Sequence, residues 1–447
     1  MSRIRIIITI IVVVLTTLLT GCTGKEPNEI AYVVALGIDS TDDDNYKITI
    51  QYANTTQISG GASESGGKAG SEIVDNVTIE APNIYAGVDL ANNIVSKSFS
   101  MSHAKLIVFS KEIAEKGVKD LIETLVRSEE IRPDVFIAVA NTTANDYLTS
   151  VNPEMEVNPA QYYQLIYQKN QLVGIPDGQL REFFTGLYTD NYDSILPVAG
   201  VIEGSGGNSQ NDDKGQSKDS QNEDSEGSSE SLDSIESKNS DENEKEKDAE
   251  KNTSKYEYDI KNYVGGETAI EKKNKAEAIG AAVFEKDKMV GELGEVETEI
   301  CKMLKGDYSY SYLTYYNNDT PDIPITVKTT QQKKPKYKID TDKKTVDIEL
   351  YIESDLYSLP SDYNVENKIE EFERDVANYT SSACTEFINN FTKKYNSDIL
   401  KLNEKVKYKF LTNNQYNWFK KNVSWSEYKF SVCTNFKVRR TGLIVRE

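Results

Sequence analysis

The chain is poor in the residues that carry most enzyme chemistry: it has one histidine, four cysteines and two tryptophans among 447 residues. Any Ser-His-Asp or Cys-His arrangement would have to run through His103. No P-loop, GxGxxG, GxSxG or HExxH motif occurs. The sequence therefore gives no support to an enzyme, and we expect no catalytic residue and no cofactor.

Cysteine is too scarce for a disulfide-stabilised scaffold. After Cys22 only Cys301, Cys384 and Cys433 remain, and three cysteines cannot all pair. No CxxC or Cys/His spacing appears, which excludes a zinc module, and we expect no metal site. Buried, unpaired thiols that act as small apolar residues are the favoured interpretation, and one Cys–Cys bond is the alternative.

Long apolar runs are also missing, except at the N-terminus. Arg3 and Arg5 precede an apolar stretch from Ile6 to Leu19. A spanning helix needs about 20 residues, so this shorter stretch is typical of a signal peptide. It ends in Leu19-Thr20-Gly21-Cys22, the pattern of a bacterial lipoprotein signal, in which diacylglycerol is attached to the cysteine and the chain is cut before it. We predict lipidation at Cys22; the alternative is an uncleaved anchor with an incidental cysteine.

The formal net charge of −21 excludes two classes of partner. A strongly acidic surface repels nucleic-acid phosphates and anionic lipid headgroups, so we expect no nucleic-acid binding. Membrane attachment would therefore depend on acyl chains. Two chains, at about 0.8 kcal/mol per buried methylene, give the stable anchoring that one does not.

One low-complexity segment divides the chain. Residues 202–255 carry sixteen acidic residues against seven lysines and almost no large apolar side chains. Such a segment cannot bury enough surface to offset its ordering entropy, which predicts disorder. The predicted organisation is a signal peptide at 1–21, an N-terminal region at 22–200, an acidic disordered linker at 201–260 and a C-terminal domain at 261–447.

The N-terminal region has the pattern of a mixed α/β unit. The apolar run 30–38 and the alternating run 46–52 predict a β-hairpin. The acids Asp42–Asp44 between them lack the glycine and distal glutamate of a calcium loop, so a solvated turn accounts for them better. Residues 105–109 and 135–140 predict strands joined by a right-handed helical crossover, with Ser110 as helix cap and a break at Gly117. Further helices are expected near 84–95, 161–173 and 178–188.

The C-terminal part has the pattern of an α+β domain. It opens with a second hairpin signature over 278–291 and a short helix over 295–304. Strands are expected at 323–328, 336–339, 346–352 and 430–438. Apolar residues three or four apart predict the longest helix, which we expect to pack on an antiparallel-type sheet: Ile369, Phe372, Val376, Tyr379, Ala383, Phe387 and Phe391. The fold class is thus α+β.

Three polar or aromatic groups are candidate functional residues. His103 precedes a strand, where a structural role is favoured over catalysis. Arg127 and Arg132 flank Glu129 and Glu130, a pattern of local ion pairs in a turn or of a subunit contact. Tyrosines crowd residues 308–316, where an exposed strand or a partner surface fits at least as well as a peptide or sugar site.

Four stretches together resemble one family. They are Asn28-Glu29-Ile30-Ala31 shortly after the lipobox, with the strand ending in Gly37-Ile38-Asp39; Ser102 to Val108 with Arg127 to Arg132; Leu196-Pro197; and Ala282 to Leu293. In this order they resemble the Ger(x)C lipoproteins, the C subunits of spore germinant receptors. The family's usual Trp-Asp pair after the lipidated cysteine is replaced here by Thr23-Gly24.

The resemblance implies a function that the composition does not. It implies a lipoprotein on the outer leaflet of the inner spore membrane, anchored through diacylglyceryl on Cys22. It also implies two membrane partners, the A- and B-type receptor subunits, and a role in receptor assembly and the response to nutrient germinants. The alternative is a lipid-anchored extracytoplasmic solute-binding or sensor protein. A hydrolase would have to rely on His103.

Overall fold

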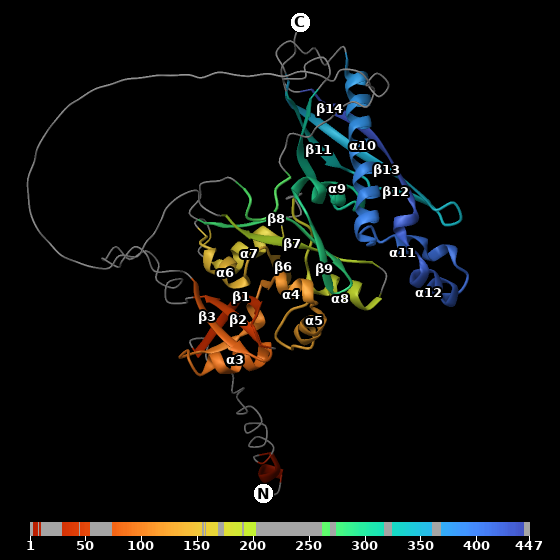
Figure 1. Ribbon diagram of the computed structural model, residues 1–447. Coiled ribbons are helices and arrows are strands. Elements are labelled where there is room, and N and C mark those ends of the chain that lie inside the picture. The colour runs from red at the N-terminus through yellow and green to blue at the C-terminus, as the bar shows by residue number, and fades with distance from the viewer. Residues whose placement is uncertain are drawn as a thin grey trace, which may run out of the picture. The chain divides into compact units, whose positions relative to one another are not determined.

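The structure is a computed structural model, shown as a ribbon in Figure 1. It describes residues 3–7, 9, 29–43, 45–53, 74–153, 156, 158–168, 174–189, 192–202, 262–268, 274–316, 324–359 and 368–441. Cys22 and the acidic segment lie outside the described residues. Among the described helices, none is long and apolar enough to cross a membrane.

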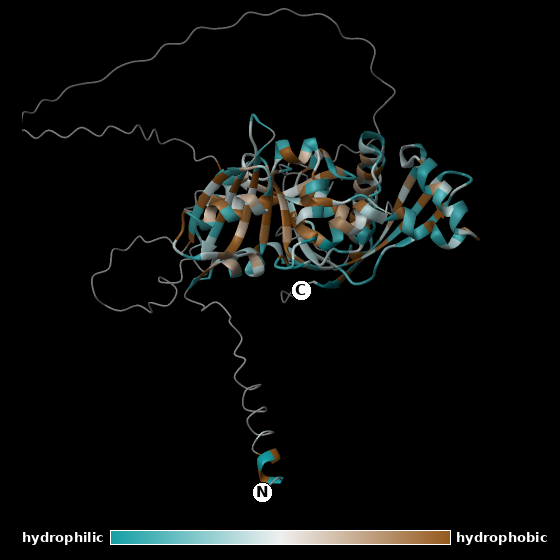
Figure 2. Ribbon diagram, turned by 90° about the horizontal axis from the view of Figure 1, so that it is seen from below, coloured by the Kyte–Doolittle hydropathy of each residue, from teal (hydrophilic) through white to brown (hydrophobic). Residues whose placement is uncertain are grey.

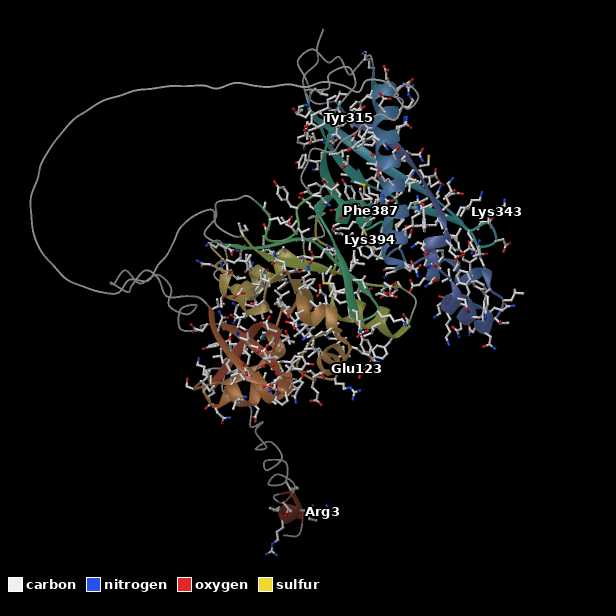
Figure 3. All side chains as sticks on the ribbon, in the orientation of Figure 1. Arg3, Glu123, Tyr315, Lys343, Phe387 and Lys394 are labelled. Atoms are coloured by element: carbon white, nitrogen blue, oxygen red, sulfur yellow. The ribbon has the colours of Figure 1, made fainter. Side chains whose placement is uncertain are left out.

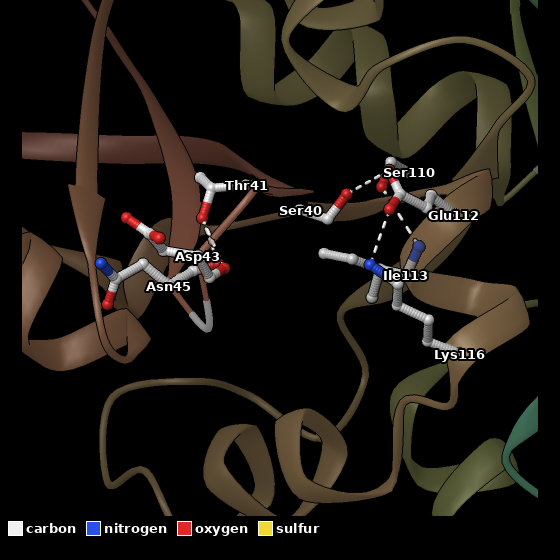
Figure 4. Close-up of polar contacts among 8 residues, drawn as sticks. All are labelled: Ser40, Thr41, Asp43, Asn45, Ser110, Glu112, Ile113 and Lys116. Atoms are coloured by element: carbon white, nitrogen blue, oxygen red, sulfur yellow. Dashed lines mark hydrogen bonds and ion pairs between the residues drawn. The ribbon is translucent and has the colours of Figure 1, made fainter.

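The first sheet begins with the predicted hairpin. β1 (Ile30–Ser40) pairs antiparallel with β2 (Tyr46–Ala53), and β2 pairs antiparallel with β3 (Val74–Ala81). In the turn, the Thr41 hydroxyl donates to the carbonyl oxygens of Asp43 and Asn45, both at 2.9 Å. Figure 4 shows this closed polar turn, which agrees with the turn interpretation of the acidic run.

The centre of this sheet is parallel, as the strand–helix–strand pattern predicts. β5 (Leu106–Ser110) lies parallel to β1, β6 (Phe136–Ala140) lies parallel to β5, and β7 (Ile195–Val201) lies parallel to β6. Every residue of β5 and β6 is buried, because helices cover both faces. Figure 2 shows hydrophobic residues running along these strands.

The crossover from β5 to β6 contains two helices, α4 (Lys111–Lys116) and α5 (Lys119–Val126). Ser110 caps α4 by accepting the Ile113 N–H, as expected (Figure 4). Gly117 separates the helices with φ of 124°, a conformation that disfavours a side chain. The predicted cap and break are therefore both confirmed.

Helices pack on both faces of the first sheet. α3 (Ile84–Asn92), α4, α5 and α8 (Leu180–Thr189) share one hydrophobic core, and α6 (Ala144–Ser150) and α7 (Pro159–Tyr167) share another. The sequence pattern does not predict α6. Its first turn is held by the carboxylate of Asp39 in β1, which accepts the N–H groups of Ala144 at 2.6 Å and Asn145 at 3.0 Å.

The second predicted hairpin forms, but it extends the first sheet. β8 (Ala276–Glu285) pairs antiparallel with β7 on one side and with β9 (Lys288–Leu293) on the other. The resulting order is β3-β2-β1-β5-β6-β7-β8-β9, with β4 (Ser98–Ser100) parallel to the start of β1. The domain boundary near residue 260 stays a prediction, while the strands that follow it pair with the first sheet.

The second sheet has five strands. β10 (Tyr310–Tyr316), β11 (Pro324–Gln331), β12 (Lys336–Asp340) and β13 (Thr345–Ser358) pair antiparallel. β14 (Lys429–Arg440) lies parallel to β13, so the sheet is not wholly antiparallel. A parallel return needs a crossover, which consists of α10 (Ile369–Tyr395), α11 (Leu402–Val406) and α12 (Asn413–Asn422).

The predicted long helix, α10, spans 27 residues and packs along β14 (Figure 1). Its buried residues include Phe372, Val376, Phe387 and Phe391 of the predicted apolar stripe. The expected α+β class, with a long helix on the C-terminal sheet, is confirmed.

A second row of α10 side chains covers the free edge of β14. Four side chains of α10, four or eight residues apart, accept backbone N–H groups of β14 residues that are two or four apart. The pairs are Asn389 with Phe430, Thr385 with Val432, Ser381 with Thr434 and Glu373 with Val438. Four helical residues rise about 6 Å and two strand residues about 6.6 Å, so the spacings match. The α10 side chains thereby satisfy strand N–H groups that a neighbouring strand would otherwise bind.

Candidate functional site

A pocket lies where β4 and the 3₁₀ turn Met101–His103 meet α3, α5 and the turn after α5. Its volume is about 660 Å³. The lining residues are Tyr85, Val88, Asp89, Asn92, Phe99, Met101, Thr124, Arg127, Ser128, Glu129 and Glu130. We call it the α3–α5 pocket. It unites two stretches singled out in the sequence, the one around His103 and the one from Arg127 onward.

The floor of the α3–α5 pocket is apolar and firmly held. Val88, Phe99 and Met101 are buried. The Asn92 side chain accepts the Phe99 N–H at 2.8 Å, which fixes β4 to the end of α3. The Glu130 carboxylate accepts the Met101 N–H at 2.7 Å, which fixes the turn after α5 to the 3₁₀ turn. The pocket is therefore preformed by contacts between its own walls.

The two arginines form local ion pairs, as predicted, although not with the glutamates between them. Arg127 bonds to Glu123 at 3.2 Å, one turn back on α5, where Figure 3 labels Glu123. Arg132 forms a bidentate ion pair with Asp134, with N–O distances of 3.0 and 3.2 Å. Among the described residues, no arginine pairs with Glu129 or Glu130 on the rim.

His103 is exposed and lies just outside the lining. Its ring packs against Tyr32 of β1, with centroids 4.8 Å apart. The cap of the 3₁₀ turn comes from Ser100, whose hydroxyl accepts the Ser102 N–H. His103 thus has a packing contact just before β5, which agrees with a structural role, and the cap of the 3₁₀ turn is Ser100.

The tyrosine-rich stretch forms β10 and divides by strand alternation. Tyr308, just before the strand, and Tyr315 are buried, and Figure 3 labels Tyr315 on this strand. Tyr312 and Tyr316 are exposed, at 53% and 38%. Tyr312 meets exposed Tyr357 of β13 at 5.3 Å between centroids. A strand is therefore confirmed, but it is exposed only in part.

A second pocket, of about 450 Å³, lies between the β8–β9 turn and the helices α11 and α12. Its lining is mostly polar and includes Asp193, Lys286, Asp398 and Asn403. Asp398 is 3% exposed, and its carboxylate accepts the N–H groups of Leu402 at 2.7 Å and Asn403 at 2.8 Å. Burial raises the pKa of Asp398 to about 7, although these two hydrogen bonds lower it.

Asp193 links this pocket to the first sheet. Its carboxylate accepts the N–H groups of Asp398 at 2.9 Å and Lys286 at 3.2 Å. Its own N–H donates to the Asp398 carbonyl oxygen at 3.2 Å. In a separate contact, the buried ammonium of Lys302 in α9 (Glu295–Lys305) donates to the Ile175 carbonyl oxygen at 2.9 Å, which joins α9 to the segment before α8. Burial lowers the pKa of Lys302 to about 8.

The cysteines agree in part with the sequence interpretation. The three described cysteines are unpaired. Cys301 and Cys384 are buried, whereas Cys433 is exposed on β14, so the expectation of burial is wrong for Cys433. Strand alternation explains this, because Cys433 lies between the buried residues Val432 and Thr434.

Within the described ranges, no group of three or more His, Cys, Asp or Glu side chains is arranged to hold a metal ion. The sequence pointed to the Arg127–Glu130 side of the α3–α5 pocket but missed Tyr85 and Asp89. These two residues lie on the outer side of a helix whose apolar spacing was the only visible signal.

Comparison with known proteins gives consistent results along both halves of the chain. The family described as spore germination protein N-terminal domain matches residues 24–201, and the family described as spore germination B3/GerAC like, C-terminal, matches residues 279–442. Relatives in Bacillus subtilis (strain 168) include spore germination protein KC, 26% identical over 36% of this chain and 43% of the relative. Another is spore germination protein B3, 26% identical over 31% of this chain and 36% of the relative. These alignments span less than half of each relative.

The structure titled crystal structure of the GerBC protein is also similar. It is 14% identical, with a TM-score of 0.48, over 90% of this chain and 96% of that one.

Proposed function

Because the chain belongs to the Ger(x)C family, the C subunits of spore germinant receptors, we propose that it is a membrane-anchored lipoprotein that assembles with the receptor's membrane subunits. The observation that carries the proposal is the order of the sequence: a lipoprotein signal ending at Cys22, followed at residue 24 by the first family match. Its work is binding and positioning, and it catalyses no reaction. Its location is the extracytoplasmic face of the inner spore membrane.

The anchor is the diacylglyceryl group on Cys22. The net charge of −21 would oppose attachment to anionic lipid by charge alone. Two acyl chains supply a sequence-independent attachment that this charge does not prevent. The Cys22→Ala chain should therefore leave the membrane fraction. If it still fractionates fully with membrane, the anchor proposal is wrong.

The partners in this proposal are the A- and B-type membrane subunits. Support comes from the hydrogen bonds between Asp193, just before β7 of the first sheet, and Asp398, in the helical crossover of the second sheet, because a scaffold must hold its binding faces in register. The test is co-expression with the two membrane subunits of its receptor. Both should co-purify with the wild-type chain in detergent, and germination in response to nutrients should be lost when the chain is deleted.

A second candidate function is a lipid-anchored solute-binding or sensor protein. The polar pocket of about 450 Å³ beside Asp398 favours it, since its volume suits a small solute. A rise in the Tm of the Cys22→Ala chain on addition of a nutrient germinant would support solute binding. No rise with any nutrient, together with co-purification of the membrane subunits, would support assembly.

A further inference from the structure

The α3–α5 pocket combines an apolar floor with an acidic rim. Phe99 and Met101 lie at its base, and the phenol ring of Tyr85 stands at its edge. A flat apolar floor suits the methylene stem of a lysine or arginine side chain. A tyrosine ring adds attraction for the cationic head.

The rim carries more negative than positive charge. Asp89, Glu129 and Glu130 are exposed and line the pocket, and none of them has a lysine or arginine partner within the described part of the chain. Arg127, the one cation among the described lining residues, is bound to Glu123. The rim therefore attracts a cation and repels the anionic headgroups of a lipid surface.

The position of the pocket restricts what can reach it. β1 begins at Ile30, which pairs with Ser98 of β4. The next β4 residue, Phe99, is part of the pocket floor. Glu29 follows Cys22 by seven positions, a span of at most about 25 Å when fully extended. With the anchor at Cys22, the pocket is held within a few nanometres of the lipid surface, at the level of the extracytoplasmic loops of integral proteins.

We propose that the α3–α5 pocket receives a lysine or arginine side chain from an extracytoplasmic loop of a membrane-embedded receptor subunit. This inference rests on the proposed function, because the tether supplies its geometry. It adds the location of the contact and the charge of the partner. The stem lies on Phe99 and Met101, and the cation lies between Asp89 and the two glutamates.

The test is a charge reversal at the two rim acids whose side chains have no structural hydrogen bond, Asp89→Lys with Glu129→Lys. The matched control is Asp42→Lys with Glu115→Lys, which makes the same charge change at exposed positions near the other end of β1. Each full-length chain is co-expressed with the two membrane subunits of its receptor. The rim variant should lose co-purification at least tenfold, while membrane fractionation and Tm stay unchanged. The control should co-purify like the wild type.

A second arm tests direct contact by charge exchange. Each lysine and arginine in the extracytoplasmic loops of the membrane subunits is changed to glutamate, and one such change should restore co-purification of the rim variant. Undiminished co-purification of the rim variant, or no restoring partner change, would overturn the pocket proposal. Binding of the Cys22→Ala chain, with its acidic rim intact, to phosphatidylglycerol vesicles would show that the rim does not repel lipid and would also overturn it. Failure of the wild-type chain to co-purify would instead count against the proposed function.

Discussion

The side-chain amide of Asn389 in α10 forms both hydrogen bonds that a neighbouring strand would offer to Phe430 of β14. Its oxygen accepts the Phe430 N–H at 3.1 Å, and its nitrogen donates to the Phe430 carbonyl oxygen at 3.0 Å. Few side chains can do this, because the group must contain a donor and an acceptor side by side, as an amide does. Asn389 is therefore the most strand-like member of the row that covers this edge.

Replacing Asn389 with alanine should destabilise the protein. The change leaves two backbone groups of Phe430 without partners at a half-buried position, which costs about 1–3 kcal/mol. The better helix propensity of alanine returns about 0.5 kcal/mol. Urea unfolding of the Cys22→Ala chain measures the difference. The control is Asn390→Ala at the adjacent exposed position, which should not lower stability; equal losses at both positions would contradict the edge interpretation.

Asp398 should make stability depend on pH in a defined window. An unfolded aspartate has a pKa of about 3.9, and burial raises the pKa of Asp398 to about 7 in the folded chain. Folding thus favours the protonated form, and the stability from this group is fully present below pH 4 and is lost as pH rises through 7. Between pH 5 and pH 8 the loss is about 2.6 kcal/mol, at roughly 1.4 kcal/mol per pKa unit.

Asp398→Asn isolates this contribution. The free energy of unfolding of the wild type minus that of the variant should fall by about 2.6 kcal/mol from pH 5 to pH 8. Taking the difference cancels groups that titrate alike in both chains, such as Glu299, whose pKa burial raises to about 7. A difference that stays flat across this range would show that Asp398 is ionised throughout.

The three cysteines after Cys22 should differ sharply in reactivity. Burial raises the pKa of the Cys301 thiol to about 11 and that of Cys384 to about 12, whereas Cys433 is exposed. Only the thiolate reacts, and only if the reagent reaches it. In the Cys22→Ala chain, a thiol-specific reagent should modify one thiol in the native state, identified as Cys433 by mass spectrometry. Modification of all three in the native state would be inconsistent with this packing.

Removal of residues 205–250 should leave the Tm nearly unchanged. The composition of this segment predicts that it buries little apolar surface. Ile202, before the segment, donates its N–H to the carbonyl oxygen of Lys275, after the segment, at 2.8 Å. A short connection therefore suffices to join the flanking strands. Thermal unfolding of the shortened chain tests this, and a large loss of stability would show that the segment packs on the rest.

The periodic spacing of apolar residues predicted the helices and strands that bury one face and expose the other. The β1–β2 hairpin and α10 follow from periods of two and of three to four residues. Pattern did not predict α6, because its first turn depends on Asp39, more than a hundred residues away in the chain. It also did not place the β8–β9 hairpin in the first sheet, since a hairpin looks the same in either sheet.

The residues of the α3–α5 pocket could likewise be predicted from the sequence only in part. Arg127 to Glu130 could be singled out because charged residues cluster in sequence. Tyr85 and Asp89 could not, because their relation to these residues arises only when α3 packs beside α5. The polar row of α10 was similarly hidden, since Ser381, Thr385 and Asn389 have the pattern of a solvated helix face when no strand is known to lie beside it.

The covered edge of β14 has a consequence for a chain held on a surface. Proteins confined to a membrane face meet copies of themselves far more often than they would in solution, and exposed strand edges are where such encounters become irreversible stacking. Since α10 occupies the outer edge of β14, that edge cannot take a strand from a neighbouring copy. The long helix therefore acts as protection against self-association, which crowding under the proposed anchor would otherwise promote.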